Sequence, residues 1–130
     1  MKKEIVNVDR GLSATPLSAA VKAGGFVFLS GVPPREPGSS KIAFGDVRRQ
    51  TELVLEGLKH RLEASGSSLA QVVKCNVFVT NAAYFEIINE VYARYFPTDP
   101  PARTFITVGS WPWPFDVEID CIAITGERED

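Results

Sequence analysis

The chain has 130 residues, of which 45% are hydrophobic, and its formal net charge is −2. This length and composition predict one globular domain, residues 1–130, with a sizeable core. The weak negative charge and the scattered basic residues argue against nucleic acid or an acidic membrane surface as a partner. No apolar run approaches the roughly 20 residues that cross a bilayer, and none follows the N-terminal lysines as in a signal peptide. We therefore expect a cytoplasmic protein with no membrane partner.

The first third of the chain predicts three strands and a loop. Residues 3–9 (KEIVNVD) are typical of a short strand. Residues 17–31 (LSAAVKAGGFVFLSG) predict a hairpin that turns at Gly24-Gly25. The segment 32–45 (VPPREPGSSKIAFG) is rich in proline, glycine and serine, and it predicts a loop.

A first helix is expected to begin after Asp46, a suitable N-cap, and to end at Gly66. Its apolar residues recur at helical spacing and predict one buried stripe: Val47, Val54, Leu55, Leu58 and Leu62. The basic clusters at 46–50 (DVRRQ) and 58–63 (LKHRLE) are interpreted as solvated helix faces.

The second half predicts a strand, a helix and two further strands. In the strand at 69–80 (LAQVVKCNVFVT), alternation places Val73, Cys75, Val77 and Val79 on one face and Val72, Lys74, Asn76 and Phe78 on the other. A helix is expected from near Asn81 to Pro97, with an inner stripe of Phe85, Ile88, Tyr92 and Tyr95. Residues 104–108 (TFITV) and 116–125 (DVEIDCIAIT) complete the pattern. The order β-β-β-α-β-α-β-β indicates an α+β fold with about six strands.

This pattern also predicts self-association. Two helices cover only one face of such a sheet, yet Phe78, Ile122 and Ile124 point to the opposite face. Burial of that apolar surface is favourable by roughly 25 cal/mol per Å². We therefore expect a closed homo-oligomer.

Most familiar catalytic machinery is missing from the sequence. His60, the only histidine, lies off the apolar stripe between two basic residues, so a histidine-based zinc site or nucleophile is not expected. Cys75 and Cys121 lie in apolar runs and are interpreted as buried, reduced thiols. No metal site and no phosphate-binding glycine loop is predicted.

Arg103 and Glu118 are the strongest candidates for function. Arg103 follows two prolines that fix its approach, and a guanidinium donates two parallel hydrogen bonds to a carboxylate. Glu118 lies within an apolar strand, where burial raises a carboxyl pKa and favours proton transfer near neutrality. The alternative is that Arg103 only forms an ion pair with Glu118 or Asp120. Asn89, on the apolar stripe of the second helix, either hydrogen-bonds within the core or borders a pocket.

The chain resembles the Rid family, the reactive-intermediate deaminases also known as YjgF-type proteins, over nearly its whole length. The resemblance is carried by segments 19–31 (AAVKAGGFVFLSG), 72–81 (VVKCNVFVTN) and 85–96 (FEIINEVYARYF). Its most specific part is 100–108 (PPARTFITV) followed by 117–124 (VEIDCIAI), with 15 positions between Arg103 and Glu118.

The resemblance implies a chorismate-mutase-like fold, a homotrimer and sites at the subunit interfaces. It also implies that Arg103 binds a substrate carboxylate and that Glu118 positions the hydrolytic water. Backbone groups of Gly31 and Phe105, near Ser30, would help to orient the reacting atoms. No cofactor is implied, because an enamine such as 2-aminoacrylate tautomerises to an imine that water converts to a 2-keto acid and ammonia.

Several positions depart from the family pattern and make the expected pocket more apolar. Leu17 stands where relatives commonly have tyrosine, Val32 where many have glutamine, and Phe105 where a small residue or cysteine is frequent. The loop SWPWPF (110–115) brings Trp111 and Trp113 to the expected pocket edge. These departures favour a larger unsaturated substrate, such as an aminomuconate-type intermediate.

Three functions remain open from the sequence. The first is an imine and enamine deaminase with the residues above as its site. The second is a non-catalytic trimer that binds small carboxylates or keto acids through Arg103. The third, a ribonuclease or translation inhibitor, is disfavoured by the negative charge and by the absence of a basic, aromatic-lined surface.

Overall fold

The computed structural model describes residues 1–8 and 15–126, so the last residue of the expected strand 3–9 lies outside the described part. Six strands, two α-helices and two short 3₁₀ turns follow one another as β1 (Glu4–Val6), β2 (Ala20–Ala23), β3 (Phe26–Val32), α1 (Val47–Ala64), η1 (Leu69–Gln71), β4 (Val72–Val79), η2 (Ala82–Tyr84), α2 (Phe85–Tyr95), β5 (Ala102–Thr107) and β6 (Val117–Ile124). The expected order of strands and helices is confirmed.

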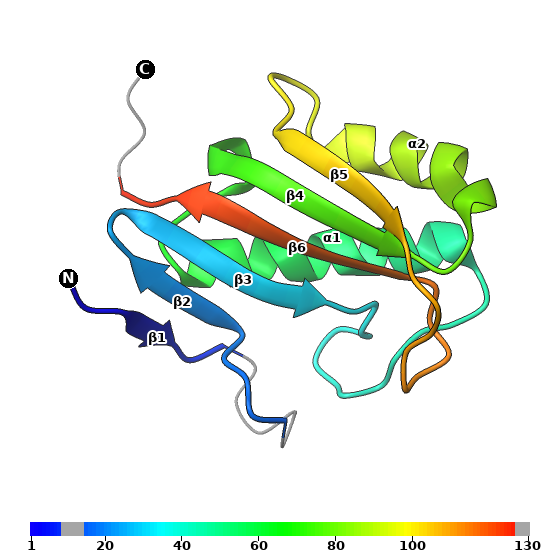
Figure 1. The fold of residues 1–130 in the computed structure, drawn as a ribbon, viewed down its shortest axis with the longest axis horizontal. Helices are drawn as coiled ribbons and strands as arrows, with labels where there is room; N and C mark the ends of the chain where they lie inside the picture. Colours follow the sequence, from blue (N-terminus) through cyan, green and yellow to red (C-terminus); the bar gives the residue numbers. More distant parts are fainter. Residues whose placement is uncertain (9–14, 127–130) are drawn as a thin grey trace.

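The strands form one mixed sheet in the order β1-β2-β3-β6-β4-β5 (Figure 1). All neighbours are antiparallel except β4 and β5, which are parallel because α2 connects them. The predicted hairpin turn is present: Gly24 and Gly25 have φ of 57° and 84°, a region that favours glycine. The last strand in the chain, β6, lies at the centre of the sheet, between β3 and β4.

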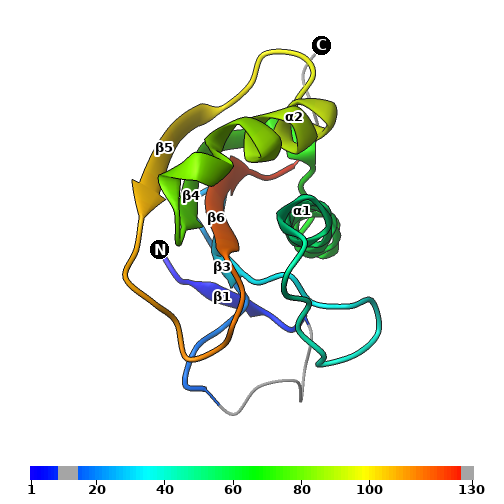
Figure 2. The ribbon, with the colours of Figure 1, turned by 90° about the vertical axis from the view of Figure 1, so that its right-hand side faces the viewer.

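Both helices cover the same face of the sheet (Figure 2). The predicted stripe of α1 is buried, at 8% exposure or less for every member. The Asp46 carboxylate accepts a hydrogen bond from the Arg49 backbone N–H, and Gly66 follows the helix with φ of 78°. The predicted start and end of this helix are therefore confirmed.

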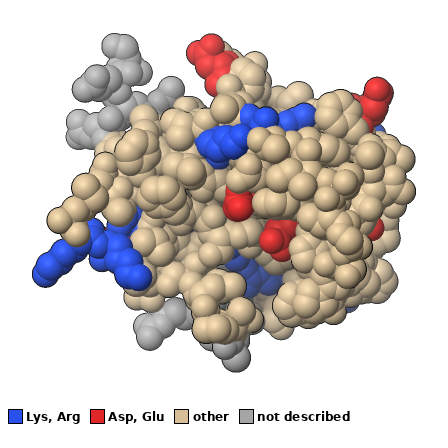
Figure 3. Space-filling model, in the orientation of Figure 1, with Lys and Arg blue, Asp and Glu red and all other residues tan. Residues whose placement is uncertain are grey.

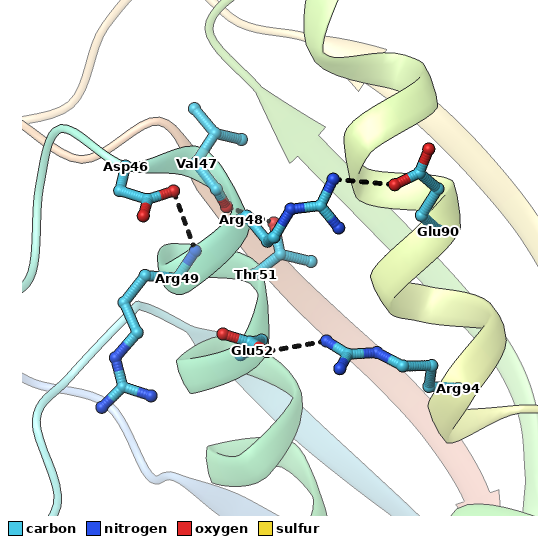
Figure 4. A network of polar contacts seen from close by, with 8 residues as sticks. All are labelled: Asp46, Val47, Arg48, Arg49, Thr51, Glu52, Glu90 and Arg94. Atoms are coloured by element: carbon cyan, nitrogen blue, oxygen red, sulfur yellow. Dashed lines mark hydrogen bonds and ion pairs between the residues drawn. The ribbon is translucent and has the colours of Figure 1, made fainter.

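The outer sides of the two helices are joined by ion pairs (Figure 4). Arg48 of α1 contacts Glu90 of α2 at 2.7 Å, and Arg94 of α2 contacts Glu52 of α1 at 2.7 Å. These side chains are partly or largely exposed, so solvent and salt screen both pairs and each contributes little to stability. Helix position is set mainly by the buried stripe beneath them.

The prediction for the strand at 69–80 was wrong at its beginning. Residues 69–71 form the 3₁₀ turn η1, and the pairing of β4 with β6 shifts register between Val72 and Lys74. This irregularity exchanges the faces to which the first two side chains of β4 point, so that Val72 is buried and Val73 is 42% exposed. From Cys75 onward the predicted alternation holds.

The inner stripe of α2 was predicted only in part. Ile88 and Tyr92 are buried as expected, and Tyr95 packs against the core. Phe85 is 42% exposed, and the fully buried Val91 was not predicted. The difference arises because the 3₁₀ turn η2 precedes α2 and places Phe85 at the rim.

The sheet face away from the helices, the open face, carries few charged side chains (Figure 3). Glu118, Asp120 and Ile122 lie on it, opposite in direction to the buried Val117, Ile119 and Cys121. The exposed large side chains that share this face, by their pairing across the strands, are Ile5, Phe26, Phe28, Ile106 and Ile124. Figure 3 shows mostly uncharged surface with two small acidic patches near its middle.

Cys75 and Cys121 are directly opposite each other on β4 and β6, and both are free and buried. Burial raises the pKa of Cys75 to about 11 and also raises the pKa of Cys121. A thiol in this state is a poor nucleophile and a well-packed core group, as predicted.

Candidate functional site

A cavity of about 570 Å³ lies beside the open face, between β3, β6 and the loops that flank them. Its size is that of a small-molecule site. Five of the expected site residues line it: Leu17, Ser30, Gly31, Trp113 and Glu118. The cavity therefore collects residues from four separate segments of the chain.

Glu118 is the acidic side chain that lines the cavity. It lies on β6, opposite Phe78 of β4, and is half-buried. Burial raises the pKa of its carboxyl group above the ordinary value of 4.5, and the nearby carboxylate of Asp120 raises it further. The guanidinium of Arg61 acts in the opposite direction. A carboxylate with a raised pKa is suited to take up and release a proton.

Ser30 and Gly31 form the wall next to this carboxylate. They lie where the register between β3 and β6 shifts, between Leu29 and Val32. A Cβ atom at Gly31 would overlap the Glu118 carboxylate oxygen, so glycine makes room for that side chain. The Ser30 hydroxyl donates a hydrogen bond to the Ser18 carbonyl at 2.6 Å, which leaves its oxygen free to accept one from a ligand.

An aromatic stack forms another wall. The rings of Trp111 and Phe115 are 4.5 Å apart between centroids with planes at 25°, and Trp113 and Phe115 are 6.5 Å apart at 17°. All three side chains line the cavity. Phe115 is buried, whereas Trp113 is 54% exposed.

The base of this loop is fixed by the next residue, Asp116. Its backbone N–H donates to the Gln50 side-chain oxygen at 2.7 Å, and the Gln50 amide donates back to its carboxylate at 3.0 Å. The Thr80 hydroxyl donates to the other carboxylate oxygen at 2.8 Å. These bonds tie the start of β6 to α1 and to the end of β4.

Arg103 lies elsewhere, on the edge strand β5 and on the helix-covered face. Its guanidinium carbon is 4.9 Å from the centroid of the Tyr92 ring, 5.7 Å from that of Phe85 and 5.9 Å from that of Phe105. Phe85 and Phe105 pack edge to face at 4.9 Å. These rings hold the guanidinium by cation–π contacts. Among the described residues, no carboxylate forms an ion pair with Arg103.

The strand register decides which predicted residues share a face. On β4, the partner of Arg103 is the buried Cys75, and the partner of Glu118 is Phe78. These two partners are an odd number of positions apart, so their side chains point to opposite faces. Arg103 and Glu118 of one chain therefore point to opposite faces of the sheet. The alternative that Arg103 only pairs with Glu118 or Asp120 of its own chain is wrong, because Asp120 shares the face of Glu118.

Asn89 belongs with Arg103 rather than with the cavity. It lies on α2 between Phe85 and Tyr92, and its side-chain oxygen is buried without a hydrogen-bond partner among the described residues. Phe105 also lies on this side, where it pairs with Val77. The expected site is thus divided into a cavity half and an Arg103 half.

Sequence reasoning missed Arg61. The cluster at 58–63 was interpreted as a solvated face, but Arg61 is only 6% exposed and lines the cavity. The interpretation holds for Lys59 and His60, which are exposed. A signal was present, since Arg61 lies three residues after Leu58 and beside Leu62 on the buried stripe.

The described residues contain no group of three or more His, Cys, Asp or Glu side chains placed to hold a metal ion. Over residues 1–8 and 15–126, no helix combines the length and apolar character that a membrane span requires.

Comparison with known proteins identifies the family. The profile of the family described as Endoribonuclease L-PSP matches residues 9–125. The chain belongs to this family. Reactive Intermediate Deaminase A of Arabidopsis thaliana is 40% identical over 95% of the chain, which spans 66% of that protein. Protein DfrA of Myxococcus xanthus is 41% identical, with 96% of this chain and 98% of that protein covered.

Solved structures agree with the sequence comparison. YyfA of Yersinia pestis, described as a Rid family protein, is 31% identical with a TM-score of 0.89, and 95% of this chain and 100% of that one are covered. TdcF of E. coli, solved with bound serine, is 32% identical with a TM-score of 0.86, at coverages of 95% and 99%. The resemblance to the Rid family is therefore confirmed, together with the α+β fold of six strands and two helices. The Arabidopsis protein is described as chloroplastic, and Protein MMF1 of Saccharomyces cerevisiae, 38% identical over 86% of this chain and 77% of that protein, as mitochondrial, so the cytoplasmic location stays a prediction.

Proposed function

We propose that this protein is a homotrimeric deaminase that hydrolyses reactive enamine and imine acids to 2-keto acids and ammonia, at sites shared between copies. The observation that carries the proposal is the division of the site. Glu118 lies in a cavity on one face of the sheet, and Arg103 lies at the sheet edge on the other face. A second copy that supplies its Arg103 to the cavity would complete the site.

The open face supports such an assembly. Among the described residues it carries five exposed large apolar side chains across β1, β3, β5 and β6, and α1 and α2 both lie on the other side of the sheet. Patches of this kind on a soluble protein mark contacts with other chains. A closed symmetric assembly buries this face equally in every copy. The resemblance to the family supports three copies.

Arg103 would bind the substrate carboxylate. Its planar guanidinium rests on three aromatic rings, which fixes its plane and leaves its outer N–H groups available to a ligand. Bidentate binding of the carboxylate would orient the neighbouring C=N bond toward Glu118.

Glu118 would serve as the acid–base group. Tautomerisation moves a proton from the enamine nitrogen to the terminal carbon and gives the imine. Glu118 then takes a proton from water as the water oxygen bonds to the imine carbon; the C=N electron pair moves to nitrogen, which receives that proton from Glu118. The proton of the new hydroxyl group is then transferred to the same nitrogen as the C–N bond breaks, which releases ammonia and leaves the C=O group. Only protons and one water are exchanged, so the chemistry calls for no electron sink and no cofactor.

Two relatives support this function. The Arabidopsis protein is named a reactive intermediate deaminase, and the E. coli structure holds serine, a small amino acid with a carboxylate. The family description also names an endoribonuclease. The net charge of −2 and the sparsely charged open face do not favour RNA as the substrate.

The first test uses 2-aminoacrylate generated in place by a PLP-dependent dehydratase, with its decay followed in the presence and absence of the protein. We expect Arg103→Ala to abolish both turnover and binding of keto acids, and Glu118→Gln to abolish turnover alone. Arg94→Ala, at an exposed arginine of α2, is the matched control and should change neither. Binding of keto acids without any acceleration of enamine decay would favour the carboxylate-binding alternative.

The second test asks whether two copies share one site. The inactive variants Arg103→Ala and Glu118→Gln are unfolded together in equal amounts and refolded as a mixture. A site built from two copies would recover about one quarter of wild-type activity, because each partner supplies its intact residue half of the time. Recovery of no activity, with mixed oligomers present, would contradict the shared site.

A further inference from the structure

We propose that the aromatic wall Trp111–Phe115–Trp113 makes this cavity selective for imine acids with a planar apolar side chain, the class derived from aromatic amino acids. The inference rests on the proposed deaminase function and adds the substrate class. It concerns the loop 110–115, which lies at the cavity containing Glu118.

The geometry of the wall favours a flat partner. The rings of Trp111 and Trp113 each lie within 25° of parallel to the ring of Phe115, so each forms a stacked pair with it. Phe115 at 3% exposure anchors the stack in the protein, and Trp113 at 54% exposure presents its ring at the outer end. Another aromatic ring extends such a stack by an offset or edge contact, which an aliphatic side chain of similar volume does not provide.

The wall is formed before a ligand arrives. Pro112 and Pro114 restrict the backbone on both sides of Trp113. Asp116, next to Phe115, is held by hydrogen bonds from Gln50 and Thr80. A preformed aromatic surface loses little conformational entropy on binding, so most of the contact energy contributes to the binding free energy.

The cavity is much larger than the smallest imine acids require. The cavity measures about 570 Å³, which is within the range of sites that hold drug-sized ligands. A three-carbon enamine would leave most of this space to water, in contact with apolar rings. The Leu17 side chain, 58% exposed at the same cavity, adds to the apolar surface. A substrate with a planar side chain would bury this apolar surface by packing that side chain against the wall, with its imine carbon toward Glu118.

The kinetic test compares imines that an L-amino-acid oxidase produces from phenylalanine and from leucine. Semicarbazide traps the free imine, and the fall in semicarbazone with added protein gives kcat/KM. We expect the phenylalanine-derived imine to be preferred by about tenfold, the discrimination that one good apolar contact provides. Trp113→Leu should lower this preference to about one. Phe44→Leu, at an aromatic residue 66% exposed outside the cavity lining, should leave the preference unchanged.

A binding test separates this inference from the proposed function. Trp111 and Trp113 are the only tryptophans, so intrinsic fluorescence reports on the wall alone. Unreactive 3-phenylpropanoate should change the fluorescence at about tenfold lower concentration than 4-methylpentanoate. The fluorescence change should be smaller in Trp113→Phe than in wild type. Selective binding without imine hydrolysis would refute the deaminase and keep the aromatic site. Hydrolysis of both imines at equal kcat/KM would overturn the aromatic site. Dissociation of the Trp113→Leu variant into single chains would also overturn it, because the indole would then belong to the contact between copies.

Discussion

Replacing Gly31 by alanine tests how the cavity holds Glu118. A Cβ atom at this position would overlap the carboxylate oxygen and would lie 2.6 Å from the Glu118 Cδ and 3.0 Å from its Cγ. Gly31 is not among the residues with positive φ, so alanine meets no backbone strain there. The whole effect of the substitution therefore acts through the Glu118 side chain.

The magnitude follows from how that side chain can respond. Overpacking costs about 1–3 kcal/mol, but the nearest atom is the end of a flexible side chain, so we expect about 1 kcal/mol of destabilisation. Activity should suffer more, because a catalytic group displaced by about 1 Å loses roughly 100-fold in rate. In a Glu118→Ala background the overlap is gone, and Gly31→Ala should be neutral or stabilise by about 0.4–1 kcal/mol.

The assay is a double-mutant cycle on urea unfolding at one fixed protein concentration, with imine hydrolysis measured for the active proteins. The expected result is a loss of stability in the wild-type background that disappears without the Glu118 carboxylate. An equal loss in both backgrounds would show that Gly31 is required for another reason. Full activity in Gly31→Ala would refute the proposed placement of Glu118.

The remaining predictions concern the charge near Glu118, the base of the loop and the open face. Because the Glu118 pKa is raised above 4.5, the folded state binds its proton more tightly than the unfolded state. The contribution of Glu118 to the free energy of unfolding is then greatest below pH 4.5 and is lost as pH rises through the raised pKa. Glu118→Gln should remove this decline, as measured by urea unfolding at several pH values. Arg61 lowers the Glu118 pKa. Arg61→Met should therefore move the acidic limb of the kcat/KM profile to higher pH, and Arg61→Lys should move it less. An unchanged limb would show that Arg61 does not influence the Glu118 carboxyl group. Gln50→Leu leaves the Asp116 N–H and one carboxylate oxygen without partners, at about 1–3 kcal/mol each or about 2–6 kcal/mol together, and should lower Tm by about 6–24 °C. Phe28→Glu places a charge on the open face and should shift the mass in sedimentation from trimer to single chain, whereas an intact trimer would argue against that interface.

Local patterns in the sequence were sufficient for the elements themselves. The spacing of Val47, Val54 and Leu58, with Asp46 before and Gly66 after, predicted α1 with its two ends. Here the physical reason is that periodicity, capping and glycine conformation act over a few residues. Prediction was wrong where a register shift intervened, as at Val73, and where one charged residue within a basic cluster was buried, as at Arg61.

The sequence by itself determined the α+β order and the apolar second face of the sheet, and it singled out Arg103 and Glu118 as candidate site residues. Only the tertiary structure decided that these two groups lie on opposite faces of one chain. The reason is that the face of a strand residue depends on parity within its strand and on pairing with its neighbours. Arg103 pairs with Cys75 and Glu118 with Phe78, and that register between β5, β4 and β6 arises from contacts between segments far apart in the chain.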